Sequence, residues 1–164
     1  MNHPGFDLRY TYVTDLPYLK EWVETPETLH FFPMQEEKEI VDALQCWIGF
    51  SRYSCSLTAV IDGVPCGIGT LFLMPYRKLS HHCQIKMVVD PKWRKQGVGS
   101  SLLKNLKHLA KTQFRQELVH IEVFEGNPII DLLKKYDFHE FARQEKFVKE
   151  DGKYYARILL ESYL

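Results

Sequence analysis

The sequence lacks an excess of either charge, because Lys plus Arg and Asp plus Glu both number 21 and the formal net charge is zero. Proteins that bind nucleic acid or anionic membranes over a broad surface are usually basic, so the composition argues against both partners. Any positive binding site must therefore be local. The chain has 164 residues, of which 45% are hydrophobic, which predicts a single domain, 1–164, with a buried core.

Long apolar runs are also missing, and none approaches the length of a membrane-spanning helix. The opening residues, MNHPGFDLRY, do not combine a basic segment with an apolar one, so we expect no secretory signal. These features predict a cytoplasmic protein without a membrane partner.

A CxxC pair is absent, and the four cysteines are scattered at Cys46, Cys55, Cys66 and Cys83. A chain that is apolar enough to form a core does not need a disulfide framework, so reduced thiols are expected. The neighbouring His81, His82 and Cys83 do not predict a zinc site, because alternate residues of a strand point to opposite faces. We expect no metal.

Hydrophobic periodicity and turn signals predict a mixed α/β chain in the order β-α-α-β-β-β-α-β-α-β-β, without repeats or linkers. Strands are expected at 6–13, on both sides of Asp62-Gly63, at 82–89, at 118–124 and on both sides of 150–152. Helices are expected after an N-cap at Thr14, around 40–48, after the glycine pair at 97 and 99, and after Pro128, with 24–34 read as loop. A crossover helix permits parallel pairing between 82–89 and 118–124, and hairpins predict antiparallel pairing on either side.

The most informative stretch is VVDPKWRKQGVGSSLLKNL, which passes from a strand through a basic glycine turn into a helix. A helix start offers free N–H groups and a positive dipole end, and glycines let a ligand come close. The stretch fits neither the P-loop pattern nor the dinucleotide fingerprint, whose third glycine is replaced by Leu102. Arg94, Gly97 and Gly99 instead form Arg-x-x-Gly-x-Gly, in which the N–H groups from Lys95 to Ser100 can point at a pyrophosphate. The pattern alone supports an anion site and tight helix packing about equally.

The element order, the block VVDPKWRKQGVG and the later block EVFEGNPIIDLLKKYDF together resemble the GNAT superfamily of acyl-CoA N-acyltransferases, over roughly 6–164. The resemblance implies an enzyme that transfers the acetyl group of acetyl-CoA to a primary amine of a small molecule or a protein N-terminus, by direct attack in a ternary complex. It implies a mostly antiparallel twisted sheet with a splayed parallel central pair and flanking helices. Homodimers are common in the family. Arg143 and Asp151–Tyr154 are similar to the ribosomal-protein alanine and polyamine branch, although the acid often found two residues later is Ala156.

The resemblance also implies which residues bind acetyl-CoA. The backbone at the end of strand 82–89 would meet the pantetheine arm, the glycine turn would hold the pyrophosphate, and the Asn after strand 118–124 would lie near the pantetheine. The set is Met87, Val88, Val89, Arg94, Lys95, Gln96, Gly97, Val98, Gly99, Ser100 and Asn127. Asn127 also fits the role of a helix N-cap, and one residue can serve both purposes.

Three residues are candidates for the chemistry. An amine is protonated at neutral pH, so a base is useful, and Glu122 matches the position of the catalytic Glu in some family members. The backbone N–H of Val89 would donate to the oxyanion. The Tyr that commonly protonates the leaving thiolate is replaced by Leu133, which is expected to face the sulfur, and Tyr136 lies one helical turn further on.

Each of these assignments has an alternative. Glu122 is otherwise an exposed strand carboxylate, with Gln84 and His120 as lesser candidates for the base, and Tyr136 is otherwise a core aromatic. The missing Tyr motivates a rival function, a non-catalytic acyl-CoA-binding or regulatory module of the same fold. A nucleotide-phosphate binder with different chemistry is a weaker rival.

Overall fold

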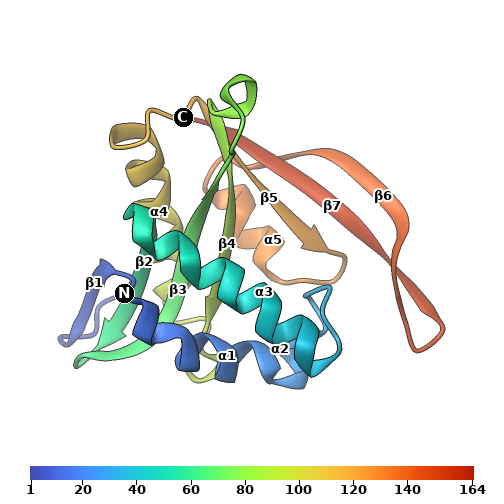
Figure 1. Ribbon diagram of the computed structural model, residues 1–164, viewed down its shortest axis with the longest axis horizontal. Helices are drawn as coiled ribbons and strands as arrows, with labels where there is room; N and C mark the ends of the chain where they lie inside the picture. The colour runs from blue at the N-terminus through green and yellow to red at the C-terminus, as the bar shows by residue number, and fades with distance from the viewer.

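The elements follow the predicted order, with one short helix more, in the computed structural model, which describes residues 1–164 (Figure 1). The strands are β1 (Phe6–Tyr10), β2 (Ser56–Ile61), β3 (Val64–Leu73), β4 (His82–Val89), β5 (Leu118–Phe124), β6 (His139–Glu150) and β7 (Lys153–Tyr163). The helices are α1 (Leu16–Glu24), α2 (Pro26–Leu29), α3 (Glu37–Gly49), α4 (Val98–Thr112) and α5 (Ile129–Lys135). One sheet runs β1-β2-β3-β4-β5-β7-β6, and only β4 and β5 are parallel, so the predicted mixed sheet is confirmed.

Helices cover both faces of this sheet (Figure 1). The apolar stripes of α1 and α3 pack on one face, against Ile68 of β3 and Val88 of β4. The stripe of α4 and the buried side of α5 pack on the other face, against Leu71, Ile85 and Val119 among others. The β6–β7 hairpin projects beyond these layers as a long arm, and β6 forms one edge of the sheet (Figure 1).

Two glycines of β3 bring α4 unusually close to the sheet. A Cβ atom at Gly69 would lie 2.5 Å from Leu106 Cδ1, and one at Gly67 would lie 3.0 Å from Leu102 Cδ1. Neither glycine has the positive φ that only glycine tolerates easily, so their role is close approach rather than a turn. The first turn of α4 is thereby held against β3 and β4.

The parallel strands β4 and β5 pair only at their beginnings. Residues 82–84 lie opposite 118–120, and no further pairs follow. Beyond that point β4 continues its pairing with β3 as far as Val89, and β5 continues with β7 as far as Phe124. Each strand therefore follows its outer neighbour, and a wedge opens between their C-terminal halves (Figure 1).

Two local expectations were wrong. Helix α1 begins at Leu16 after a short 3-10 turn, and Thr14 makes no capping hydrogen bond. The segment 24–34 is not all loop, because α2 starts at Pro26, where the missing N–H of proline costs nothing in the first turn of a helix.

The cysteines are all unpaired. Cys46 is exposed, whereas burial raises the pKa of Cys55 and Cys66 to about 11 and that of Cys83 to about 12. No helix of the structure has both the length and the apolar character that crossing a membrane requires.

A buried carboxylate ties α1 to the first two strands. Asp15 is 3% exposed and accepts hydrogen bonds from both Nη atoms of Arg9, at 2.8 and 2.9 Å, from the Tyr12 N–H at 2.9 Å and from Thr58 Oγ1 at 2.9 Å. Burial alone would raise the pKa of Asp15, but the hydrogen bonds from Arg9, Tyr12 and Thr58 outweigh it, and the pKa is lowered. Folding therefore favours the ionised form.

We expect Asp15→Ala to lower the free energy of unfolding by about 3 kcal/mol at pH 7, because Arg9 loses its partner in a mostly buried pair. Since the folded-state pKa is lowered, this stabilisation is present above the unfolded-state pKa of about 3.9 and is lost as the pH falls through the folded value. Urea denaturation at pH 7 and in acid measures both effects. Asp42→Ala, at an exposed position of α3, is the control, and an Asp15→Ala variant as stable as this control would contradict the assignment.

Candidate functional site

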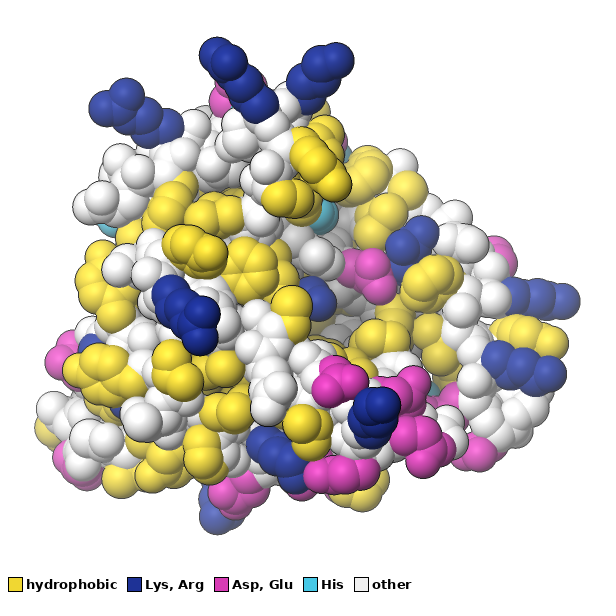
Figure 2. Space-filling model, in the orientation of Figure 1, with side chains coloured by type: hydrophobic (Ala, Val, Ile, Leu, Met, Phe, Trp, Pro, Cys, Tyr) yellow, Lys and Arg dark blue, Asp and Glu magenta, His cyan; other side chains and the backbone are white.

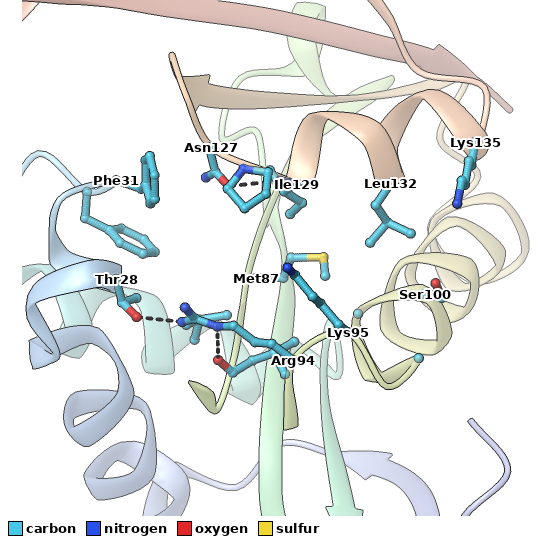
Figure 3. Close-up of a pocket in the computed structure, with 16 residues that line it drawn as sticks. Thr28, Phe31, Met87, Arg94, Lys95, Ser100, Asn127, Ile129, Leu132 and Lys135 are labelled. Carbon is cyan, nitrogen blue, oxygen red and sulfur yellow. Dashed lines mark hydrogen bonds between the residues drawn. The ribbon is translucent and has the colours of Figure 1, made fainter. Parts of the chain in front are cut away.

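A cleft of about 410 Å³ occupies the wedge between the separating strands (Figure 3). Its walls come from the end of β4, the glycine turn, the first turn of α4, the start of α5, and α2 with the residues that follow it. The cleft thus lies beside the glycine turn, where the sequence predicts that a ligand binds.

The backbone of β4 offers unpaired groups to this cleft. The Asp90 N–H donates to the Cys66 carbonyl on the β3 side, and the direction of the hydrogen-bonding groups alternates along a strand. The N–H groups of Met87 and Val89 therefore point away from β3 towards β5, which no longer pairs with them. An extended ligand can take the place of the missing strand residues.

The glycine turn presents a row of N–H donors. Lys95 and Gly97 have φ values of 59° and 93°, in the left-handed region, and Gly97 is the N-cap of α4. None of the backbone N–H groups from Lys95 to Ser100 donates to an acceptor within the protein. Together with the positive dipole end of a 15-residue helix, they form a turn whose donors are suited to an anion.

Basic side chains surround the same turn. Arg94 is fixed by two hydrogen bonds, from Nε to the Val89 carbonyl at 3.2 Å and from Nη2 to Thr28 Oγ1 at 2.5 Å. In Figure 3, Lys95 extends into the cleft from the turn and Lys135 reaches towards it from α5. The chain has no net charge, yet it concentrates positive charge here.

Gly99 keeps the cleft open at its floor. A Cβ atom at this position would lie 3.3 Å from Leu132 Cδ2 and 3.4 Å from Met87 Cε. A side chain at Gly99 would therefore fill the space between β4 and α5.

Nine of the eleven residues predicted to bind the cofactor line this cleft: Met87, Val88, Val89, Arg94, Lys95, Gly97, Gly99, Ser100 and Asn127. Two do not. The exposed Gln96 side chain donates to the Lys92 carbonyl, and the Val98 side chain is buried in the core, so each can contribute only through its backbone N–H.

Asn127 also serves as a helix cap, which is the second role predicted for it. Its Oδ1 accepts the Ile129 N–H at 3.0 Å and so caps α5, while the residue also lines the cleft (Figure 3).

No sequence signal predicts the wall formed by Thr28, Phe31 and Phe32. These residues lie in and after α2, in the segment that was expected to be loop. The helical turn at Pro26–Leu29 brings them to the cleft, and no local pattern of residues predicts that turn.

The expectation that Leu133 faces the cleft is wrong. Leu133 is fully buried in the main core, and its neighbour Leu132 lines the cleft instead. Tyr136 follows the last residue of α5, packs against the same core and is not among the residues that line the cleft.

A second hollow, of about 420 Å³, opens on the sheet face that carries α1 and α3. Gln84 and His120, the last residues paired between β4 and β5, line it together with Glu122. Figure 2 shows this face hollowed between the helices and the β6–β7 arm, with histidine, acidic and basic side chains in and around the hollow. Glu122 is thus not a freely solvated strand carboxylate, since 26% of its side chain is exposed and Arg157 Nη1 lies 3.5 Å from its Oε2.

Two histidines of this hollow are shifted towards the neutral form. The rings of His82 and His120 lie 5.2 Å apart, and burial, then the neighbouring histidine, lowers the pKa of each. Cys83, between His82 and Gln84, is buried in the core on the opposite side of the sheet, as strand alternation predicts.

Comparisons with known proteins show which proteins this chain is similar to. A model of the acetyltransferase (GNAT) family matches residues 14–138. The chain is 29% identical over 99 residues to the L-amino acid N-acetyltransferase AaaT of Escherichia coli (strain K12), in a match that covers 60% of this chain and 61% of that protein. The match thus spans about three fifths of the relative's length.

Solved structures share the fold over nearly the whole chain. A ribosomal-protein-alanine N-acetyltransferase from Brucella melitensis superposes with a TM-score of 0.78 at 18% identity, covering 96% of this chain and 99% of that one. The yncA protein of Salmonella typhimurium, solved with its cofactor acetyl-CoA, superposes with a TM-score of 0.81 at 15% identity, covering 98% and 94%.

Proposed function

Because this chain belongs to the GNAT acetyltransferase family, we propose that it transfers the acetyl group of acetyl-CoA to a primary amine of a small molecule or a protein N-terminus. The observation that carries the proposal is the coincidence of the strand wedge with the turn of free N–H donors. A non-catalytic module needs only the cleft, whereas this chain also places a carboxylate, Glu122, on the face onto which the wedge opens.

The residues of the cleft fit acetyl-CoA. The N–H group of Met87 suits an amide carbonyl of the pantetheine arm, and the donors from Lys95 to Ser100 suit the pyrophosphate, with Lys95 and Lys135 adding positive charge. When bound, acetyl-CoA supplies an activated thioester. The Val89 N–H donates to the thioester oxygen as negative charge develops there.

Glu122 takes the proton of the attacking amine in this proposal. Its carboxylate lies in the hollow, two residues beyond the last pairing between β4 and β5, and the contact with Arg157 Nη1 is long, at 3.5 Å. Direct attack requires a ternary complex in which both substrates are bound at once. In this proposal the amine binds in the hollow and the thioester of acetyl-CoA lies in the cleft.

No acidic side chain is proposed for the leaving group. Leu132 occupies the wall of the cleft that α5 provides, and a thiol with a pKa of about 8.5 leaves readily as the thiolate.

We also propose that the protein is cytoplasmic and that it has no nucleic-acid partner. Four unpaired cysteines suit a reducing compartment, and the zero net charge offers no broad basic surface. Homodimer formation remains a prediction, and β1 and β6 are the two edge strands of the sheet.

The function is tested by free-thiol release from acetyl-CoA with a library of amines, including polyamines, amino acids and peptides with a free N-terminus. We expect release that requires both the protein and an amine. CoA binding in calorimetry without turnover of any amine would instead support the non-catalytic module.

We expect Gly97→Asp to weaken CoA binding by about 100-fold, or about 2.7 kcal/mol, because the carboxylate repels the pyrophosphate and disturbs a left-handed residue. Gly63→Asp controls for the left-handed backbone, since Gly63 also has a positive φ, of 80°, but lies in the β2–β3 turn. It does not reproduce the contact that a Cβ atom at Gly97 would make with Met1 N, at 3.1 Å. Calorimetry on variants with native circular dichroism gives the comparison, and an unchanged affinity for Gly97→Asp would remove the pyrophosphate from this turn.

We expect Glu122→Gln to lower kcat by about 100-fold at neutral pH, a typical contribution of a general base, with CoA affinity unchanged. The defect should shrink at high pH, where more of the amine is already unprotonated. Glu161→Gln changes another carboxylate of the same hollow and should have little effect. A Glu122→Gln rate equal to that of the wild type at every pH would show that Glu122 is not the base.

A further inference from the structure

The hollow that Glu122 lines contains a pair of opposite charges, Glu122 and Arg157. The transfer of an acetyl group does not by itself require such a pair. The carboxylates and guanidinium of the hollow are those of Glu122, Glu161 and Arg157, and its histidines are His81, His82 and His120. Burial lowers the pKa of His82 and of His120, which favours their neutral forms. Glu161 is engaged elsewhere, with His139 Nε2 at 3.4 Å and the Tyr163 hydroxyl at 3.2 Å. The charges left for a ligand are one guanidinium and one carboxylate, side by side.

Arg157 is firmly placed, yet its donors are incompletely used. Its Cζ lies 4.2 Å from the centre of the Phe147 ring, and Nη2 donates to Gln144 Oε1 at 2.8 Å. The Nη1 contact to Glu122 is long, at 3.5 Å, and Nε is shielded from solvent without an acceptor. A guanidinium has five N–H donors in a planar fork that matches a carboxylate. The side chain of Arg157 is 29% exposed, so a ligand carboxylate can accept from its Nη groups, whereas the shielded Nε is out of reach.

The spacing of the two charges fits one class of acceptor. Covalent geometry keeps the amine and the carboxylate of an α-amino acid about 3 Å apart. The Arg157 and Glu122 side chains approach to 3.5 Å, so one zwitterion can contact both. Because Glu122 follows the last paired residue of β5 by only two positions, an amine held there stands where the wedge begins.

We propose that Arg157 and Glu122 form an acceptor subsite for a free α-amino acid, with its carboxylate on Arg157 and its amine at Glu122. The inference rests on the proposed acetyl transfer and narrows its acceptor. A peptide N-terminus has a neutral amide in place of the carboxylate and leaves the guanidinium without its partner, so the subsite excludes protein N-termini.

The test compares free L-amino acids with the matching amino acid amides and with the decarboxylated amines, by thiol release from acetyl-CoA. We expect kcat/KM to be at least about 100-fold higher for the free acids, because a site built around a hydrogen-bonded group rejects analogues that lack it. The comparison is demanding, since the amine of an amide is less basic than that of the free acid and would react better if only protonation mattered.

Arg157→Gln then separates recognition of the carboxylate from an effect on the base. We expect KM for the free amino acid to rise by about 30-fold or more, with kcat/KM for the amide and the amine within about 3-fold of wild type. Arg143→Gln is the control, because Arg143 pairs with Glu125 and Glu145 outside the hollow.

Three results would contradict the proposed subsite. They differ in whether they also contradict the proposed acetyl transfer. Equal use of acids, amides and amines removes the carboxylate contact but leaves the acetyltransferase. An equal loss for all acceptors in Arg157→Gln shows that Arg157 acts only through Glu122. Absence of thiol release with every amine removes the proposed function and the subsite with it.

Discussion

The interruption of one strand pairing is the feature on which the rest of this site depends. Strands β4 and β5 pair over residues 82–84 and 118–120 and then separate, because β4 stays with β3 and β5 stays with β7. The backbone groups of Met87 and Val89 are thereby left without partners in a partly enclosed cleft. Backbone donors in such a place need an acceptor, so the sheet itself prepares a position for an extended ligand.

The surroundings hold the wedge open and give it polarity. The glycines of β3 seat α4 on the sheet, which directs its first turn and the donors of the glycine turn at the cleft. Leu133 anchors α5 in the core, so that Leu132 and the capping residue Asn127 face the cleft. In the proposed function, the same divergence opens the cleft for the donor and lies next to the hollow for the acceptor.

The sequence predicted the framework because its signals are local. The Asp62-Gly63 turn, the alternating strands and the apolar stripe of α4 each depend on neighbouring residues, and all were confirmed. The errors came where tertiary contacts decide. Asp15 turned inward to bind Arg9, α2 supplied a wall from a segment read as loop, and a one-residue difference in helical phase put Leu133 in the core. The partner of Glu122, Arg157, lies on a different strand and carries no sequence signal.

Amide-resolved hydrogen exchange with and without CoA shows whether the strand wedge and the glycine turn bind this ligand. We expect new protection at the N–H groups of Met87, Val89 and the turn from Lys95 to Ser100, which have no acceptor within the protein. Residues 82–84, already paired with β5, should change little. Protection by CoA confined to other parts of the chain, with these amides still exchanging freely, would contradict the role of the strand wedge.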